Sequence, residues 1–416
     1  MTPPNLLLLA FLIVFFLRSA TQVILNRLNI SYIRHHGNAV PEGFQDTVDP
    51  EKLKKISAYA ADSAGFGIIS SLANQILLLV ILLSGFLPWL VESIHQWGLG
   101  LILGGLVFFA SLSLLTNLLR LPFSLYGTFV IEDRYGFNTK TFRLWVNDLL
   151  KSLALSALLG GLLLWLFLTL VVRGGNNWWV WAWVIMGIIE LLMMWLYPMI
   201  IAPLFNRFEP ITNKELENDI RTLMEKAGLR ARGVFRMDAS KRSKHTNAYF
   251  TGIGKSKRIV LFDTLLESHT GEEILAVLAH ELGHWKKKHI HKQLLLAEFL
   301  SLVGFYVAAH LLEWPLMYRT FGFLELIPYV GLFLMGALFS PLGYFIQPPA
   351  SAISRKYERQ ADDYSLALIR RAEPMVKALK RLAADNLSNL TPHPLYAWFY
   401  YSHPPLVERV ERLKAH

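Results

Sequence analysis

The sequence predicts an α-helical polytopic membrane protein with seven transmembrane helices and a cytoplasmic region in which a short sheet accompanies helices. Three observations predict this class. The 416 residues are 53% hydrophobic and 17% charged, whereas soluble proteins carry about 25% charged residues. The apolar residues form blocks of roughly 20, the length that crosses a bilayer. Lys and Arg are concentrated in alternate loops between these blocks, as the positive-inside rule requires.

Seven blocks are expected to span the membrane. They cover residues 5–25, 66–91, 99–119, 149–172, 178–204, 294–312 and 329–346. The first block could be a signal peptide, but no basic residue precedes its apolar run, so a retained span is expected.

The charge of the loops predicts the orientation. Basic residues crowd the first-to-second, third-to-fourth and fifth-to-sixth connections and the C-terminal tail, whereas the other connections are nearly free of them. This alternation places the N-terminus outside and the C-terminus in the cytoplasm. It also accounts for the net charge of +10, so no nucleic-acid partner is expected. The membrane would be the inner membrane of a bacterium or the endoplasmic reticulum of a eukaryote.

Four regions follow from this topology: membrane residues 1–204, cytoplasmic residues 205–293, membrane residues 294–347 and cytoplasmic residues 348–416. Region 205–293 is expected to contain a helix at 213–227, β-strands near 233–237, 247–251 and 258–262, and a helix that begins after Thr270. Glu273 stands three residues after Thr270, which fits a capping box. Region 348–416 is expected to be helical, with a break at 391–394.

Several polar residues lie within the predicted spans. They either face an internal hydrated space or, near span ends, extend to the interface. The set comprises Arg18, Gln22, Asn74, Gln75, Glu190 and Glu298.

The helix after Thr270 carries His280-Glu281-Leu282-Gly283-His284, an H-E-x-x-H motif. On a helix His280 and His284 share one face and can bind a single Zn²⁺, with Glu281 placed to act on a water molecule. The chain has no cysteine, so further ligands must be His, Asp or Glu. The alternative is a surface helix with two solvated histidines.

A zinc protease needs a third protein ligand on the same side of the membrane. Two crossings after His284 return the chain to the cytoplasm shortly before Glu358 and Asp362, which are four residues apart. Glu358 could complete a His₂Glu site, and Asp362 could hydrogen-bond a ligand histidine. The alternative is a charged, solvated helix beyond a span.

Together these residues resemble the motifs of a known family. HELGH followed by SRKYERQAD at 354–362 resembles the integral-membrane CAAX prenyl proteases (type I CAAX endopeptidases). Four further segments are similar to that family: FVIEDRYGFN at 129–138, PLFN at 203–206, HTNAYF at 245–250 and SHPP at 402–405. The resemblance implies seven spans enclosing a chamber, a zincin-like region with one zinc ion near its cytoplasmic side, Glu358 as third ligand and Asp362 as proton donor.

The expected roles follow from this chemistry. Glu281 is the general base, and His403 is expected by resemblance to donate to the oxyanion; otherwise it caps the Pro-Pro turn. Asn247, Ala248 and Tyr249 are expected on an exposed edge strand that pairs with an extended peptide, although Asn247 could simply end a strand. Arg355 could pair with Asp362, stabilise charge in the site or be an ordinary surface arginine.

The function expected is a membrane zinc endopeptidase acting on a peptide or protein, in the CAAX type on a prenylated Cys-a-a-X end. A heat-shock-type membrane quality-control protease would share the metal chemistry. A seven-span transporter or receptor is the non-enzymatic alternative; such proteins tend to show internal repeats, and none is found.

Overall fold

Six helical segments are long and apolar enough to span a membrane in the computed structural model, which describes residues 5–229, 233–252 and 258–415. They are Leu6–His36, Pro50–Leu83, Leu101–Glu132, Phe142–Arg173, Gly175–Phe205 and His289–Leu311. A seventh candidate is a pair of helices, Pro328–Tyr344 and Gln347–Ile369, bent by 56° where they join. The chain is therefore a mostly helical protein with six to seven apolar spans.

Several spans are composite. Short π-helical or 3-10 segments interrupt them without ending them. The elements are α1 (Leu6–His36), α2 (Pro50–Leu83), α3 (Phe86–Gln96), α4 (Leu101–Tyr126), η1 (Gly127–Glu132), α5 (Phe142–Leu155), η2 (Ser156–Gly160), α6 (Gly161–Arg173), η3 (Gly175–Asn177), α7 (Trp178–Leu196), η4 (Tyr197–Ile201), α8 (Ala202–Phe205), α12 (His289–Leu311), α13 (Pro315–Thr320), α14 (Pro328–Tyr344) and α15 (Gln347–Ile369).

The span predicted near 66–91 is present, but its bounds differ in the structure. Helix α2 ends at Leu83, and the separate helix α3 begins at Phe86. Gly85 between them has φ +84°, a left-handed conformation that glycine adopts without steric cost and that ends the helical path. Apolar composition continues through the break, so hydropathy alone does not show it.

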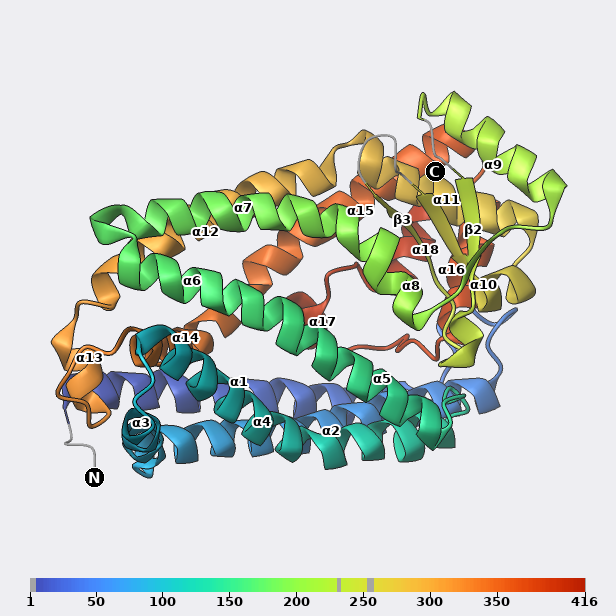
Figure 1. The fold of residues 1–416 in the computed structure, drawn as a ribbon. Helices are drawn as coiled ribbons and strands as arrows, with labels where there is room; N and C mark the ends of the chain where they lie inside the picture. Colours follow the sequence, from blue (N-terminus) through green and yellow to red (C-terminus); the bar gives the residue numbers. More distant parts are fainter. Residues whose placement is uncertain (1–4, 230–232, 253–257, 416) are drawn as a thin grey trace.

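The spanning helices form a closed ring of contacts. Figure 1 views this bundle from the side, with α7 and α12 along one edge and α1 and α2 along the opposite edge. Helix α1 packs on α2 and on α14, and α14 leads through α12 to α7. The ring continues from α7 to α6, from α6 to α4 and from α4 back to α2. Each spanning helix therefore has a neighbour on both sides.

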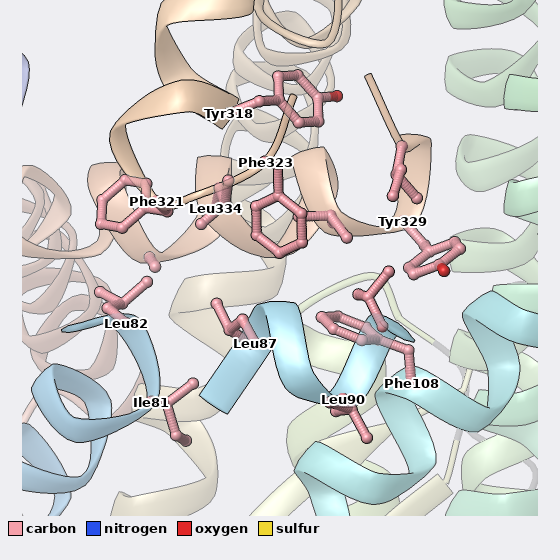
Figure 2. Close-up of a cluster of buried hydrophobic side chains, with 14 of the residues drawn as sticks. Ile81, Leu82, Leu87, Leu90, Phe108, Tyr318, Phe321, Phe323, Tyr329 and Leu334 are labelled. Carbon is pink, nitrogen blue, oxygen red and sulfur yellow. The ribbon is translucent and has the colours of Figure 1, made fainter. Parts of the chain in front are cut away.

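One end of the ring is filled by apolar side chains (Figure 2). Leu87 of α3, Phe108 of α4 and Leu334 of α14 are among its fully buried residues. Phe321 and Phe323, which follow α13, lie in the same cluster. Burial of such large side chains stabilises the end of the bundle where α3, α13 and α14 meet.

The opposite end carries a four-stranded mixed sheet with strand order β1-β2-β4-β3. Strands β2 and β4 are parallel, and the other two pairs are antiparallel. The elements here are β1 (Phe208–Pro210), α9 (Lys214–Lys226), β2 (Gly233–Met237), η5 (Ala239–Lys241), β3 (Ala248–Thr251), β4 (Arg258–Phe262), α10 (Asp263–Ser268) and α11 (Gly271–Lys286). Both helices and all three strands expected from the sequence are present, as α9, α11, β2, β3 and β4; β1, η5 and α10 were not predicted.

The C-terminal region is helical and packs against both the sheet region and the bundle. It comprises α15, α16 (Glu373–Asp385), α17 (Pro394–Tyr400) and α18 (Leu406–Lys414). Helix α16 packs on α11 and α18, while α17 packs on α15 and α1. The predicted break at 391–394 falls at the end of the loop before α17, which begins at Pro394. These contacts bring residues near 360 and 409 close to α11, the helix that carries the HELGH pentad at 280–284.

Candidate metal centre and active site

Helix α11 carries the HELGH pentad, and its cap fixes where it begins. The Thr270 side chain accepts a hydrogen bond from the Glu273 amide, and the Glu273 carboxylate accepts one from the Thr270 amide. The predicted capping box is confirmed. Leu278 and Leu282 are fully buried in the core that α11 shares with the sheet. The histidines project toward α15 instead.

Helices α11 and α15 approach each other closely at Gly283. A Cβ atom built at this position would lie 2.8 Å from Cα of Ala361, closer than packed atoms can come. Glycine within a helix costs about 1 kcal/mol relative to alanine. Here it permits the two helices to meet, so the pentad lies directly opposite Glu358.

Three side chains converge between these helices. Nε2 of His280 lies 3.2 Å from Nε2 of His284 and 3.3 Å from Oε2 of Glu358. Nε2 of His284 lies 3.2 Å from Oε1 of Glu358. Two ligands of a tetrahedral zinc ion, each about 2.0–2.1 Å from the metal, are roughly 3.3 Å apart. The three groups therefore have the spacing of a zinc coordination site.

The Glu358 carboxylate supports the same fit. Its Oε2 is buried and has no hydrogen bond of acceptable geometry in the described part of the chain. Nevertheless the Nδ1 atom of His403 is 2.7 Å from it, and Nε2 of His280 is also near. The His280 nitrogen and the Glu358 oxygen, this close and without a hydrogen bond between them, are arranged as two ligands of a common cation. The donor set suits zinc, which binds imidazole and carboxylate.

Asp362 and Arg409 lie behind His280. Nδ1 of His280 is 2.8 Å from Oδ1 of Asp362, so it donates there when Nε2 is the ligand atom. Arg409 of α18 contacts both carboxylate oxygens, at 2.6 and 3.0 Å. Asp362 is 1% exposed. A carboxylate held by three donors orients His280 and is poorly placed to give a proton to substrate.

The pair between Arg355 and Asp362, one of the possibilities left open by the sequence, is not formed. The Arg355 guanidinium donates to the carbonyl oxygens of Trp398 and Tyr401, at 3.1 and 2.6 Å. The cation of Asp362 is Arg409 instead. Arg355 thus ties α15 to the end of α17 and fixes the start of the segment that carries His403.

The protonation of His280 reflects its two acidic neighbours. Burial alone would lower the pKa of its imidazole, but the neighbouring carboxylates of Asp362 and Glu358 outweigh burial and raise the pKa to about 9. Without a metal the ring therefore carries a proton at neutral pH. A cation that binds Nε2 must displace this proton.

Glu281 and His403 each adjoin a metal ligand: Glu281 follows His280 in the sequence, and Nδ1 of His403 lies 2.7 Å from Oε2 of Glu358. Glu281 is partly exposed, and no described side chain hydrogen-bonds to its carboxylate. The His403 side chain is 61% exposed. Both groups are accessible to a bound peptide, whereas the groups behind the metal ligands are not.

Strand β3 is an edge strand, as expected. It pairs with β4 on one side, with Ala248 opposite Leu261 and Thr251 opposite Arg258. The Phe250 ring contacts Trp285 of α11, whereas Tyr249 packs on the other face of the sheet. Asn247 precedes the strand, and its side chain accepts from the Ala248 amide. The free edge of β3 is thus held beside the pentad helix.

Two of the segments that are similar to the family, 129–138 and 245–250, contact each other. His245 lies 3.3 Å from Glu132 and stacks on Phe137, with ring centroids 3.9 Å apart. Tyr59 of α2 donates to the same Glu132 at 2.7 Å. The amide of Lys244 donates to the Phe137 carbonyl. Residues 132–138 therefore anchor the chain that leads into β3.

Sequence reasoning missed Arg409, and also Glu132 as a partner of His245. Each contact joins residues more than 40 positions apart, and no spacing rule connects them. A signal did exist for the second pair, because both residues belong to segments that are similar to the family.

Both halves of the chain match family models. Residues 29–207 match the N-terminal region of CAAX prenyl proteases, which has five membrane helices, and residues 210–416 match peptidase family M48. The first match favours the CAAX type over a heat-shock-type protease, and the second identifies an enzyme rather than a transporter or receptor.

Individual proteins agree with these models. The CAAX prenyl protease 1 homolog of Arabidopsis thaliana is 35% identical over 382 residues, covering 90% of each chain. CAAX prenyl protease 1 of Saccharomyces cerevisiae is 34% identical, covering 90% of this chain and 88% of its own. The crystal structure of S. mikatae Ste24p superposes with a TM-score of 0.92 at 32% identity, covering 99% of this chain and all of the other. The chain belongs to peptidase family M48, as a membrane metalloprotease of the CAAX prenyl protease type.

Proposed function

We propose that this protein is a zinc endopeptidase whose single metal ion is held by His280, His284 and Glu358. The observation that carries the proposal is the mutual spacing of 3.2–3.3 Å between their ligand atoms. Zinc, when bound, supplies the Lewis acidity that activates water at neutral pH and polarises the scissile carbonyl.

The side chains around the metal site have separable roles. Glu281 accepts the proton of the attacking water and passes it to the leaving amine. His403, exposed at the rim, donates a hydrogen bond to the developing oxyanion. Asp362 holds His280 in the tautomer that presents Nε2, so we assign it an orienting role in place of proton donation.

Substrate binding is assigned to the free edge of β3. An extended peptide adds to such an edge through main-chain hydrogen bonds. Ala248 and Tyr249 supply the strand, and Asn247 binds the substrate backbone at its end. Because β3 packs on α11, a peptide bound there runs past the metal site.

The membrane bundle determines how substrate reaches this site. We propose seven spans, with α14 and the start of α15 forming the last one, and a cytoplasmic C-terminus as the basic loops indicate. The closed ring of helix contacts is the wall expected of an enclosed chamber. Its far end is filled by the apolar cluster of Figure 2, so substrate would enter elsewhere.

The proposed substrate is a prenylated Cys-a-a-X peptide end, from which the last three residues are removed. The test is cleavage of matched peptides, with and without a farnesyl group on the cysteine, followed by sequencing of the products. Release of the tripeptide from the farnesylated peptide, several-fold faster than from its partner, supports the assignment. Equal rates would refute prenyl recognition and leave the endopeptidase in place.

A further inference from the structure

The two histidine ligands are oriented in the same way but have different partners. Each directs Nε2 toward Glu358 and Nδ1 away from it. Behind His280 the partner is the carboxylate of Asp362. Behind His284 the partner is another imidazole: Nδ1 of His289 lies 3.1 Å from Nδ1 of His284. The pentad does not include His289, and nothing above gives it a role.

His289 is held firmly where it stands. It is 1% exposed. Its ring stacks on Tyr357 of α15, with centroids 4.2 Å apart and an interplanar angle of 10°. Its Nε2 lies 2.9 Å from Oε1 of Gln360. Lys288 just before it has φ +56°, a left-handed turn that separates α11 from α12. That turn directs the first residue of α12 back beneath the pentad.

His284, His289 and Gln360 form a row of hydrogen bonds, and one direction of donation along this row is compatible with a metal on His284. A neutral imidazole that binds a metal through Nε2 carries its proton on Nδ1. His284 then donates to Nδ1 of His289, and His289 donates from Nε2 to the Gln360 amide oxygen. If Gln360 presented its NH₂ group, the row would reverse and place a proton on Nε2 of His284, which would block the metal.

We propose that His289 is a positioning residue for the zinc site, which fixes the tautomer and ring orientation of His284 as Asp362 does for His280. This inference rests on the proposed zinc function. Partners of this kind typically contribute 10–100-fold to metal affinity. Because His289 is the first residue of α12 and Gln360 lies on α15, the row also joins a membrane span to the metal site.

The test measures the zinc dissociation constant of the full-length protein in detergent, by competition with a chelator. His289→Phe keeps the stacking volume and removes both polar nitrogens, and we expect affinity to fall by about 10–100-fold. His289→Asn keeps an acceptor at the position of Nδ1, and we expect it to recover most of that loss. The control is His291→Ala, an exposed position two residues along α12, with wild-type affinity.

Each outcome bears on one proposal. Affinity within threefold of wild type for His289→Phe, or equal losses for the Phe and Asn variants, would overturn the role of His289. If the Phe variant does not fold, Gln360→Leu replaces it, because Gln360 is half-buried and supplies the final acceptor of the row. Unchanged zinc affinity in Gln360→Leu would equally overturn the role of His289. If wild-type protein binds no zinc, the proposed function fails first, and that result is distinct.

Discussion

Removing the Arg409 side chain should cost far more stability than removing its neighbour Arg412. Both arginines lie on α18, and each pairs with an aspartate of α15. Arg409 is 2.6 Å from Asp362, and their side chains are 8% and 2% exposed. Arg412 is 2.5 Å from Asp363, and theirs are 31% and 53% exposed. The two pairs have similar shortest distances and differ in burial, and only Arg409 contacts both oxygens of its carboxylate.

Burial sets the expected magnitudes. Removing one partner of a buried ion pair leaves the other charge uncompensated and costs about 3–5 kcal/mol. An exposed pair contributes about 0–1 kcal/mol. His280 still contacts Asp362 in Arg409→Ala, so we expect a cost of about 3 kcal/mol, near the lower end. That is roughly a hundredfold change in the unfolding equilibrium.

The assay is denaturant-induced unfolding of the metal-free protein in detergent, followed by tryptophan fluorescence. Metal-free protein is used so that zinc affinity does not enter the stability. The variants are Arg409→Ala, Arg412→Ala and the pair Asp362→Asn with Arg409→Met, which removes both buried charges and should regain part of the loss. If Arg409→Ala and Arg412→Ala differ by less than about 0.5 kcal/mol, the buried pair does not have the importance assigned to it.

Three further predictions concern the metal ligands and the substrate strand. In metal-free His280, burial is outweighed by Asp362 and Glu358, which raise the pKa of the imidazole to about 9. Zinc therefore competes with a proton for this ring. The affinity for zinc should rise about tenfold per pH unit from pH 7 and level off near pH 9. Calorimetric or chelator titrations check this, and affinity that does not vary with pH contradicts it. Gly283→Ala should force α11 from α15, because the new methyl would meet Ala361 at 2.8 Å; zinc affinity should drop, and wild-type affinity would show that the helices can separate at no cost. His245→Ala should raise KM for peptides about tenfold, the worth of one hydrogen bond to a charged group, with kcat and zinc content unchanged. Steady-state kinetics and metal analysis decide this, and a loss of zinc would count against a role confined to substrate.

The spans and the ligand triad could be predicted because local rules describe them. Hydropathy over about 20 residues identifies a span, and i, i+4 spacing brings His280 beside His284. Topology put Glu358 within reach, since two crossings return the chain to the starting side, and the resemblance to the family made it the expected third ligand. The break at Gly85 could not be predicted in this way, because the composition on both sides of it is equally apolar.

The surroundings of the triad depend on tertiary packing that no local rule contains. Arg355 and Arg409 are both arginines near the site, but the packing of α18 on α15 brings only Arg409 to Asp362. His289 reaches His284 because Lys288 adopts a left-handed conformation, which its residue type does not favour. Strand β1 has three residues and ends at Pro210, too few for a period-2 pattern.

The most direct test of the central claim is one variant, Glu281→Gln, measured in two ways. The amide keeps the size of the side chain and leaves the three ligands in place, but it cannot accept a proton. We predict about one zinc ion per chain, as in wild type, with peptide cleavage reduced by about 10²–10⁴-fold. Wild-type turnover by this variant, or a wild-type protein that binds no zinc, would contradict a zinc endopeptidase centred on His280, His284 and Glu358.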